Sequence, residues 1–264
     1  MARKRVWLTW LPDDSDPDAL KTTIQVLSRS GLEVDGSKWD RDLKQLGWLQ
    51  TAQPLTDEDK ADVWIIAGRK ADFSATEVRY GLSLATATIR AKRGVPLKTI
   101  VASLDDPLDD VALPSLIGGE KRFGPPTAAW GAKTIAEAMR PAQPSSAMPY
   151  RLSVIANPSL GHWFEIGPQE GETWKGALLG VDDGEITHHG VGRSAALPDH
   201  CTLEYPSQGL KIEAAGKAFT CWSVKNELEP GTSYFVRVMG SPAHLLFGEH
   251  PESDEADMWV LDLI

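Results

Sequence analysis

The sequence predicts an α/β domain with a doubly wound parallel sheet, followed by an all-β, sandwich-like domain. Apolar strand-like runs alternate with amphipathic helical segments as far as residue 140. The stretch 141–149, PAQPSSAMP, has the Pro- and Ser-rich composition of a linker. The first 140 residues carry equal numbers of basic and acidic side chains, whereas all six His and the whole net charge of −10 lie beyond them. We therefore expect domains at 1–140 and 150–264.

The strands of the first domain follow from its apolar runs. The run VWIIA at 63–67 is apolar at every position, as a central parallel strand covered by helices on both faces requires. Further strands are expected at 6–11, 32–35 and 98–103, with an edge strand near 116–117 inside a long loop at 104–126.

The helices of the first domain follow from three- and four-residue spacing. Val78, Leu82 and Ile89 share one face of a helix expected from Ser74 to Arg93. Other helices are expected after Asp16 or Asp18 and from Thr127 to Met139, while the stretch 37–49 is ambiguous between a helix and a loop.

The second domain has short alternating runs separated by turn residues, and no helical period persists in it. Strands are expected at 152–155, 163–166, 174–181, 210–213, 219–224, 234–238 and 258–263.

Composition excludes several classes of protein. No apolar run is long enough to cross a bilayer, and the apolar start breaks at Pro12, too early for a signal peptide, so we expect a cytoplasmic protein without membrane contact. An acidic chain is repelled by phosphate, so nucleic acid is not an expected partner. Cys201 and Cys221 are expected to be reduced, although pairing stays open. His188, His200 and Cys201 are residue types found in zinc sites, but they lack ligand spacing, and we expect no metal.

One carboxylate stands out at the end of the central strand. Glu77 opens the helix that follows this strand, and the carboxyl edge of a parallel sheet is where such folds bind ligands. Two interpretations are open. Ser74-Ala75-Thr76-Glu77 is also a capping box, in which Ser74 and Glu77 only close the start of the helix. No glycine-rich phosphate motif follows the first strand, so we expect neither a nucleotide-dependent dehydrogenase nor an NTPase.

The strand at 63–67, the Ser-bearing loop and the helix opening with Glu77 resemble the third strand and following helix of TIR domains. This resemblance implies a flavodoxin-like, TIR-like fold over 1–140, with Glu77 as the catalytic residue that cleaves the nicotinamide–ribose bond of NAD. It implies a pocket shaped by Leu11, Gly68, Phe73 and Ser74, and no cofactor, because NAD is then the substrate. Two interpretations are open for Arg69 and Lys70: they hold a ligand phosphate at the edge of the sheet, or they are solvated loop charges.

Glu77, Gly81, Ala85 and the turn Gly94-Val95-Pro96 also resemble nucleoside deoxyribosyltransferases, which use a carboxylate on the same kind of bond. The segment 228–238 resembles the tyrosine corner of fibronectin type III-like domains. The sequence thus leaves three functions open. The first is a TIR-like signalling or defence enzyme whose acidic β domain recognises a protein partner. The others are a deoxyribosyltransferase-like enzyme and a non-enzymatic assembly module that forms homo-oligomers.

Overall fold

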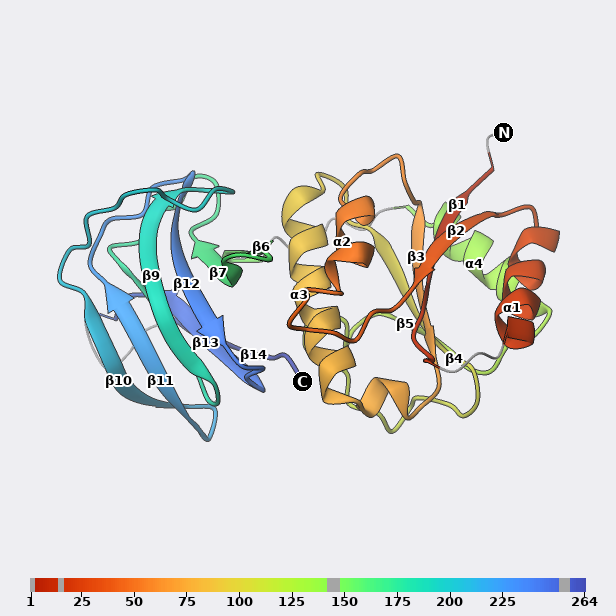
Figure 1. Cartoon of the computed structure of the whole chain (residues 1–264). Helices are drawn as coiled ribbons and strands as arrows, with labels where there is room; N and C mark the ends of the chain where they lie inside the picture. The colour runs from red at the N-terminus through yellow and green to blue at the C-terminus, as the bar shows by residue number, and fades with distance from the viewer. Residues whose placement is uncertain (1–2, 14–16, 142–147, 252–256) are drawn as a thin grey trace. The chain divides into compact units, whose positions relative to one another are not determined.

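A computed structural model describes residues 3–13, 17–141, 148–251 and 257–264 (Figure 1). The chain divides into two compact units, one formed by Met1–Leu113 with Ile117–Ser145 and the other by Pro114–Leu116 with Ser146–Ile264. The linker expected at 141–149 falls largely on 142–147, outside the described residues.

The first unit is built on a five-stranded sheet in which every neighbouring pair is parallel. Its strand order is β2-β1-β3-β4-β5. In this doubly wound order the chain adds strands first on one side of β1 and then on the other, so the switch point lies between β1 and β3. The strands are β1 (Arg5–Trp10), β2 (Glu33–Lys38), β3 (Val63–Gly68), β4 (Lys98–Ser103) and β5 (Lys121–Phe123). Every residue of β3 is buried, which confirms the central strand predicted from its apolar run.

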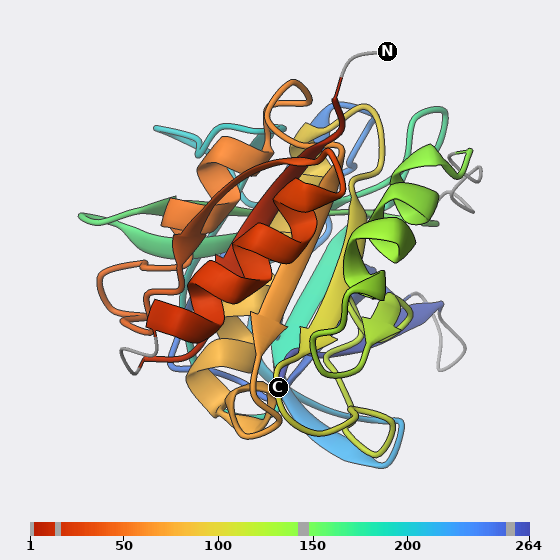
Figure 2. The same ribbon diagram turned by 90° about the vertical axis from the view of Figure 1, so that its right-hand side faces the viewer.

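Helices cover both faces of this sheet. They are α1 (Pro17–Arg29), α2 (Leu49–Leu55), the short 3-10 helix η1 (Asp72–Ser74), α3 (Thr76–Lys92) and α4 (Ala129–Met139). Figure 2 shows α1 and α4 together on one face, and α2 packs with α3 on the other. This arrangement confirms the α/β architecture expected for the first domain.

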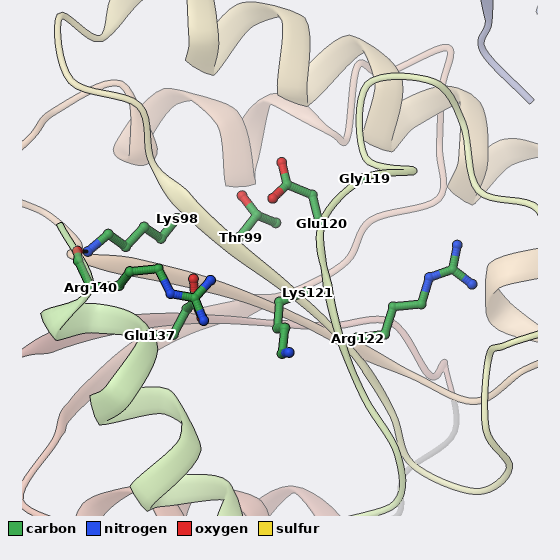
Figure 3. A pocket seen from close by; sticks show the side chains of 8 residues that line it. All are labelled: Lys98, Thr99, Gly119, Glu120, Lys121, Arg122, Glu137 and Arg140. Atoms are coloured by element: carbon green, nitrogen blue, oxygen red, sulfur yellow. Dashed lines mark hydrogen bonds and ion pairs between the residues drawn. The ribbon is translucent and has the colours of Figure 1, made fainter. Parts of the chain in front are cut away.

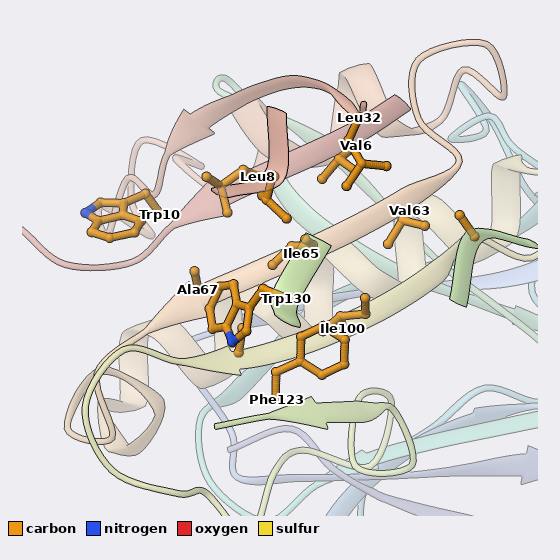
Figure 4. Close-up of a cluster of buried hydrophobic side chains, with 13 residues drawn as sticks. Val6, Leu8, Trp10, Leu32, Val63, Ile65, Ala67, Ile100, Phe123 and Trp130 are labelled. Atoms are coloured by element: carbon orange, nitrogen blue, oxygen red, sulfur yellow. The ribbon is translucent and has the colours of Figure 1, made fainter. Parts of the chain in front are cut away.

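The core on the α1–α4 face is continuous across the sheet (Figure 4). Alternate residues of β1, β3 and β4 point into it, Val34 of β2 packs against it, and Trp130 of α4 closes it. The indole of Trp130 lies 6.0 Å from the ring of Phe123 and donates hydrogen bonds to the carbonyls of Gly124 (3.1 Å) and Pro125 (3.2 Å). A buried indole N–H therefore keeps its partners, so this large side chain fills the core without leaving an unpaired donor.

The sequence left one stretch of the first unit open and misplaced one edge strand. The ambiguous stretch 37–49 holds no helix before α2, because Asp40 and Asp42 side chains bond backbone amides of 42, 44 and 45 at 2.9–3.0 Å and form turns. Leu46 also has a positive φ of 56°, which no helix accommodates. The edge strand is β5, a few residues after the predicted 116–117.

The start of β1 is held by one carboxylate. Asp62, which precedes β3, accepts hydrogen bonds from the Lys4 ammonium (2.9 Å) and the Arg5 amide (2.8 Å). These contacts join the amino ends of neighbouring strands.

The second unit contains two antiparallel sheets that contact each other. The five-stranded sheet has the order β10-β11-β8-β13-β14, and the four-stranded sheet has the order β6-β7-β12-β9. The strands are β6 (Arg151–Asn157), β7 (Gly161–Gly167), β8 (Ala177–Val181), β9 (Glu185–Arg193), β10 (Ser207–Ala214), β11 (Lys217–Val224), β12 (Thr232–Met239), β13 (His244–Glu249) and β14 (Met258–Asp262). The all-β composition expected here is confirmed.

The sequence did not predict β9 or β13. Strand β9 contains two glycines, at 190 and 192, that lie under Pro198. A Cβ atom on Gly192 would lie 2.9 Å from Cβ of Pro198, because the loop after β9 folds back over the strand. Tyr234 also departs from a tyrosine corner, since its hydroxyl pairs with Nδ1 of His189 at 2.8 Å. No helix among the described residues is both long and apolar enough to cross a membrane.

Candidate functional site at the carboxyl edge of the parallel sheet

The carboxyl ends of β1 and β3 lie side by side. Trp10 pairs with Ala67 in register, and the Leu11 amide donates to the Ala67 carbonyl at 2.9 Å. A Cβ atom on Gly68 would come within 2.7 Å of Leu11 Cδ1, so the close approach of the two strand ends favours glycine. Leu11 and Gly68, both expected at the site, therefore meet at this edge.

The segment between β3 and α3 folds as a tight turn around Asp72. Its carboxylate accepts the Arg69 amide at 2.7 Å, and the Asp72 amide donates back to the Arg69 carbonyl at 2.9 Å. Phe73 is fully buried, so its side chain belongs to the core and does not line an open pocket. The backbone of Arg69 forms part of this turn at the sheet edge.

The capping box predicted for Ser74 and Glu77 is wrong. Helix α3 begins after Ala75, and no side chain caps its first amides. The hydroxyl of Ser74 instead donates to the Lys70 carbonyl at 3.3 Å. Ser74 belongs to the short helix η1, and Ala75 occupies the N-cap position of α3, so Ser74 lies one residue too early to cap this helix. Glu77 is thus available for another role.

That role involves Arg41, a residue that sequence reasoning missed. Its guanidinium donates from Nη1 to Glu77 Oε1 at 3.1 Å, and from Nη2 to Asp72 Oδ1 at 2.5 Å and the Leu11 carbonyl at 3.2 Å. Its Nε lies 3.0 Å from an oxygen of Asp13. One arginine therefore ties the end of β1, the turn after β3 and the first turn of α3 together.

The electrostatics of this cluster favour a permanent cation. Burial alone would lower the pKa of Arg41, but hydrogen bonds to Asp72 and Glu77 and the nearby charge of Asp13 outweigh it and raise the pKa. The side chain of Glu77 is 39% exposed, whereas that of Asp72 is 12% exposed. Asp72 is the structural partner of Arg41, and Glu77 keeps access to solvent.

Arg41 carried a signal that was overlooked. It lies three residues beyond β2, and the carboxyl ends of parallel strands share one edge. The parallel strand order therefore places a charged residue that follows β2 at the same sheet edge as Glu77. The same rule applies to Asp72, which follows β3.

A second group of carboxylates follows β4. Asp105 accepts the Lys70 amide at 2.9 Å, and the Lys70 ammonium pairs with Asp110 at 2.7 Å. Burial would raise the pKa of Asp105, but hydrogen bonds from Lys70, Asp106 and Ser103 outweigh it and lower the pKa. Because Lys70 is paired here, it does not offer a free ammonium to a ligand phosphate.

Two hollows of the first unit lie elsewhere. One, of about 510 Å³, lies at the amino ends of β4 and β5 beside the end of α4 (Figure 3). Both acidic side chains that line it already have cationic partners: Glu137 pairs with Arg140 at 3.1 Å, and Glu120 pairs with Arg90 at 2.8 Å. The other, of about 290 Å³, lies between α1 and the edge strand β2. Neither includes Glu77.

The arrangement offers a solvent-accessible carboxylate held by a fixed cation at the ligand-binding edge of the sheet. A carboxylate in this setting can stabilise positive charge that develops on a bound substrate. No protein-family model matches this chain, and no curated protein sequence matches it. We therefore infer function from the geometry.

Proposed function

We propose that the first domain is a TIR-like enzyme that cleaves an N-glycosidic bond, with NAD as the leading substrate and Glu77 as the catalytic residue. One observation carries this proposal. Glu77 lies free of the capping box, exposed at the carboxyl edge of a sheet with the order 2-1-3-4-5.

Cleavage of this N-glycosidic bond needs mainly one negative charge that is positioned beside the ribose. As the bond between C1′ of the ribose and the nicotinamide nitrogen breaks, the electron pair goes to the nitrogen, and nicotinamide leaves as a neutral molecule. Positive charge then develops on the ribose, and the carboxylate of Glu77 stabilises it. Water attacks C1′ and loses a proton, which yields ADP-ribose. Arg41 acts as a positioning residue, because its contacts with Asp72 and the Leu11 carbonyl hold it in place beside Glu77.

The test is incubation of the purified full-length protein with NAD and, separately, with deoxynucleosides, read by chromatography. We expect release of nicotinamide, and Glu77→Gln should lower the rate about 100-fold or more, the scale of one positioned charge. Glu33→Gln removes an exposed carboxylate from the amino end of β2 and serves as the control. Base exchange on deoxynucleosides with no action on NAD would favour a deoxyribosyltransferase-like enzyme.

A second candidate is a non-enzymatic assembly module, with the acidic β domain as the part that recognises a protein partner. Two observations favour it: Glu77 already has a cationic partner, and neither hollow described above includes it. A protein that is inert towards NAD and nucleosides at high concentration, and that forms homo-oligomers in light scattering, would support this alternative and refute the enzyme.

A further inference from the structure

Arg237 lies at the centre of the four-stranded sheet between two aromatic rings. It is paired in register with Trp163 on β7 and with His188 on β9. Directly paired residues of antiparallel strands project from the same face. Two strands that flank a third are about 10 Å apart, yet the rings of Trp163 and His188 are 6.1 Å apart. Both rings therefore lean toward Arg237.

The guanidinium group of Arg237 has no partner among the residues that the structure describes. No hydrogen bond or ion pair joins it to them, and its Nε is inaccessible to solvent and unsatisfied. The carboxylate that follows on the same face, Glu165, is occupied by the Ser233 hydroxyl at 2.9 Å and the Ala195 amide at 2.8 Å. Arg237 as a whole is half-buried, but buried polar atoms such as its Nε are nearly always paired in folded proteins, so this unpaired donor in an acidic domain needs an explanation.

The residue next to this guanidinium, Gly161, has no side chain. A Cβ atom on Gly161 would lie 3.6 Å from both Nε and Nη2 of Arg237. Gly161 has a φ of +72°, a conformation that other residues adopt only with strain. The indole of Trp163 is held by its hydrogen bond to the Leu160 carbonyl at 3.2 Å. The site thus has a fixed aromatic wall and one side without any side chain.

We propose that Arg237 is a binding site for an oxyanion, a carboxylate or phosphate group, whose attached flat or apolar part lies against Trp163 and His188. A guanidinium presents a planar fork of N–H donors that matches both kinds of oxyanion with two parallel hydrogen bonds. The guanidinium group supplies the charge and the donors, the two rings supply apolar contact, and Gly161 places no side chain against the guanidinium. The site is separate from Glu77 and does not depend on the function proposed for it.

His162 reports on the charge of Arg237. Burial, and secondarily the positive charge of Arg237, lower the pKa of His162 to about 4. An oxyanion bound to Arg237 would cancel that charge. The pKa of His162 should therefore rise when the site is filled, which a purely structural role for Arg237 would not produce.

The experiment is an NMR titration of the full-length protein with two probes, inorganic phosphate and benzoate. We expect shifts at the Trp163 indole, the His188 ring and the Gly161 amide, with a dissociation constant on the order of 1–10 mM for such small probes. Arg237→Gln should weaken binding at least about tenfold, the scale of a lost charge-assisted bond. Arg193→Gln, which removes an exposed cation from the end of β9 in the same sheet, should leave it unchanged.

The two probes separate the ligand classes. Binding of benzoate alone identifies a carboxylate ligand with an aromatic part, and binding of phosphate alone identifies a phosphate ligand. If neither probe shifts these three residues, or if Arg237→Gln binds as well as the natural protein while remaining folded, the proposal is overturned. A His162 pKa that stays constant on saturation would also contradict it.

Discussion

Replacing Arg41 by Gln should destabilise the first domain, because this one side chain joins three segments. The Asp72 carboxylate is 12% exposed, so losing its charge-assisted hydrogen bond costs about 1.5–2 kcal/mol. Losing the bond to the Leu11 carbonyl costs about 0.5–1 kcal/mol. Glu77 and Asp13 are 39% and 69% exposed, and pairs with such solvated groups contribute only about 0.5 kcal/mol together. The sum is about 2.5–3.5 kcal/mol.

Hydrogen exchange measured by mass spectrometry suits this test. Because the chain holds two units, a single unfolding transition for the whole protein is not a safe assumption, whereas exchange reports the stability of each unit. Amides of β1 and β3 should exchange about 60-fold faster or more in Arg41→Gln, since about 1.4 kcal/mol is tenfold.

Matched variants sharpen this prediction. Asp13→Asn removes only the most exposed partner and should cost less than about 0.5 kcal/mol. Ser74→Ala should be equally mild, because Ser74 does not cap α3. Glu77→Gln should cost under about 1 kcal/mol, so its effect on activity can be read without a folding defect. If Arg41→Gln costs no more than Asp13→Asn, the reasoning that Arg41 ties these segments together is refuted.

Three further outcomes are expected. Burial raises the pKa of Cys221 to about 12, so a thiol reagent at pH 8 should modify the exposed Cys201 quickly and Cys221 only on unfolding; two fast thiols would contradict this. Gly131→Ala would place a Cβ atom 1.8 Å from the Ser30 hydroxyl oxygen, and the overpacking between α4 and α1 should lower stability by about 1–3 kcal/mol in thermal melts. Burial would raise the pKa of Asp62, but its hydrogen bonds outweigh burial and lower it, so its stabilising contribution is complete above about pH 4 and lost at lower pH. Acid titrations of Asp62→Asn should therefore show a smaller loss of stability below pH 4 than the natural protein, and identical curves would exclude this role.

The candidate site illustrates how far topology extends a local prediction. Glu77 was found because it follows the central strand directly, and connectivity alone places it at the carboxyl edge. Its capping role was wrong, because a motif read along the chain takes no account of the turn that Asp72 makes with Arg69. Arg41 was missed because it lies 36 residues before Glu77 in the chain, and the two meet through the parallel pairing of β2, β1 and β3.

The sequence by itself determined the α/β class of the first domain, the change to an all-β domain after it and the burial of β3. These features depend on the spacing of apolar residues over five to twenty consecutive positions, and this spacing can be read from a short segment of the sequence. Tertiary structure decided the rest. Strand β9 forms because it pairs with β12 along its length, and Arg237 lies beside Trp163 and His188 because three distant strands pair in one register. Such contacts join residues dozens of positions apart, and local periodicity carries no information about them.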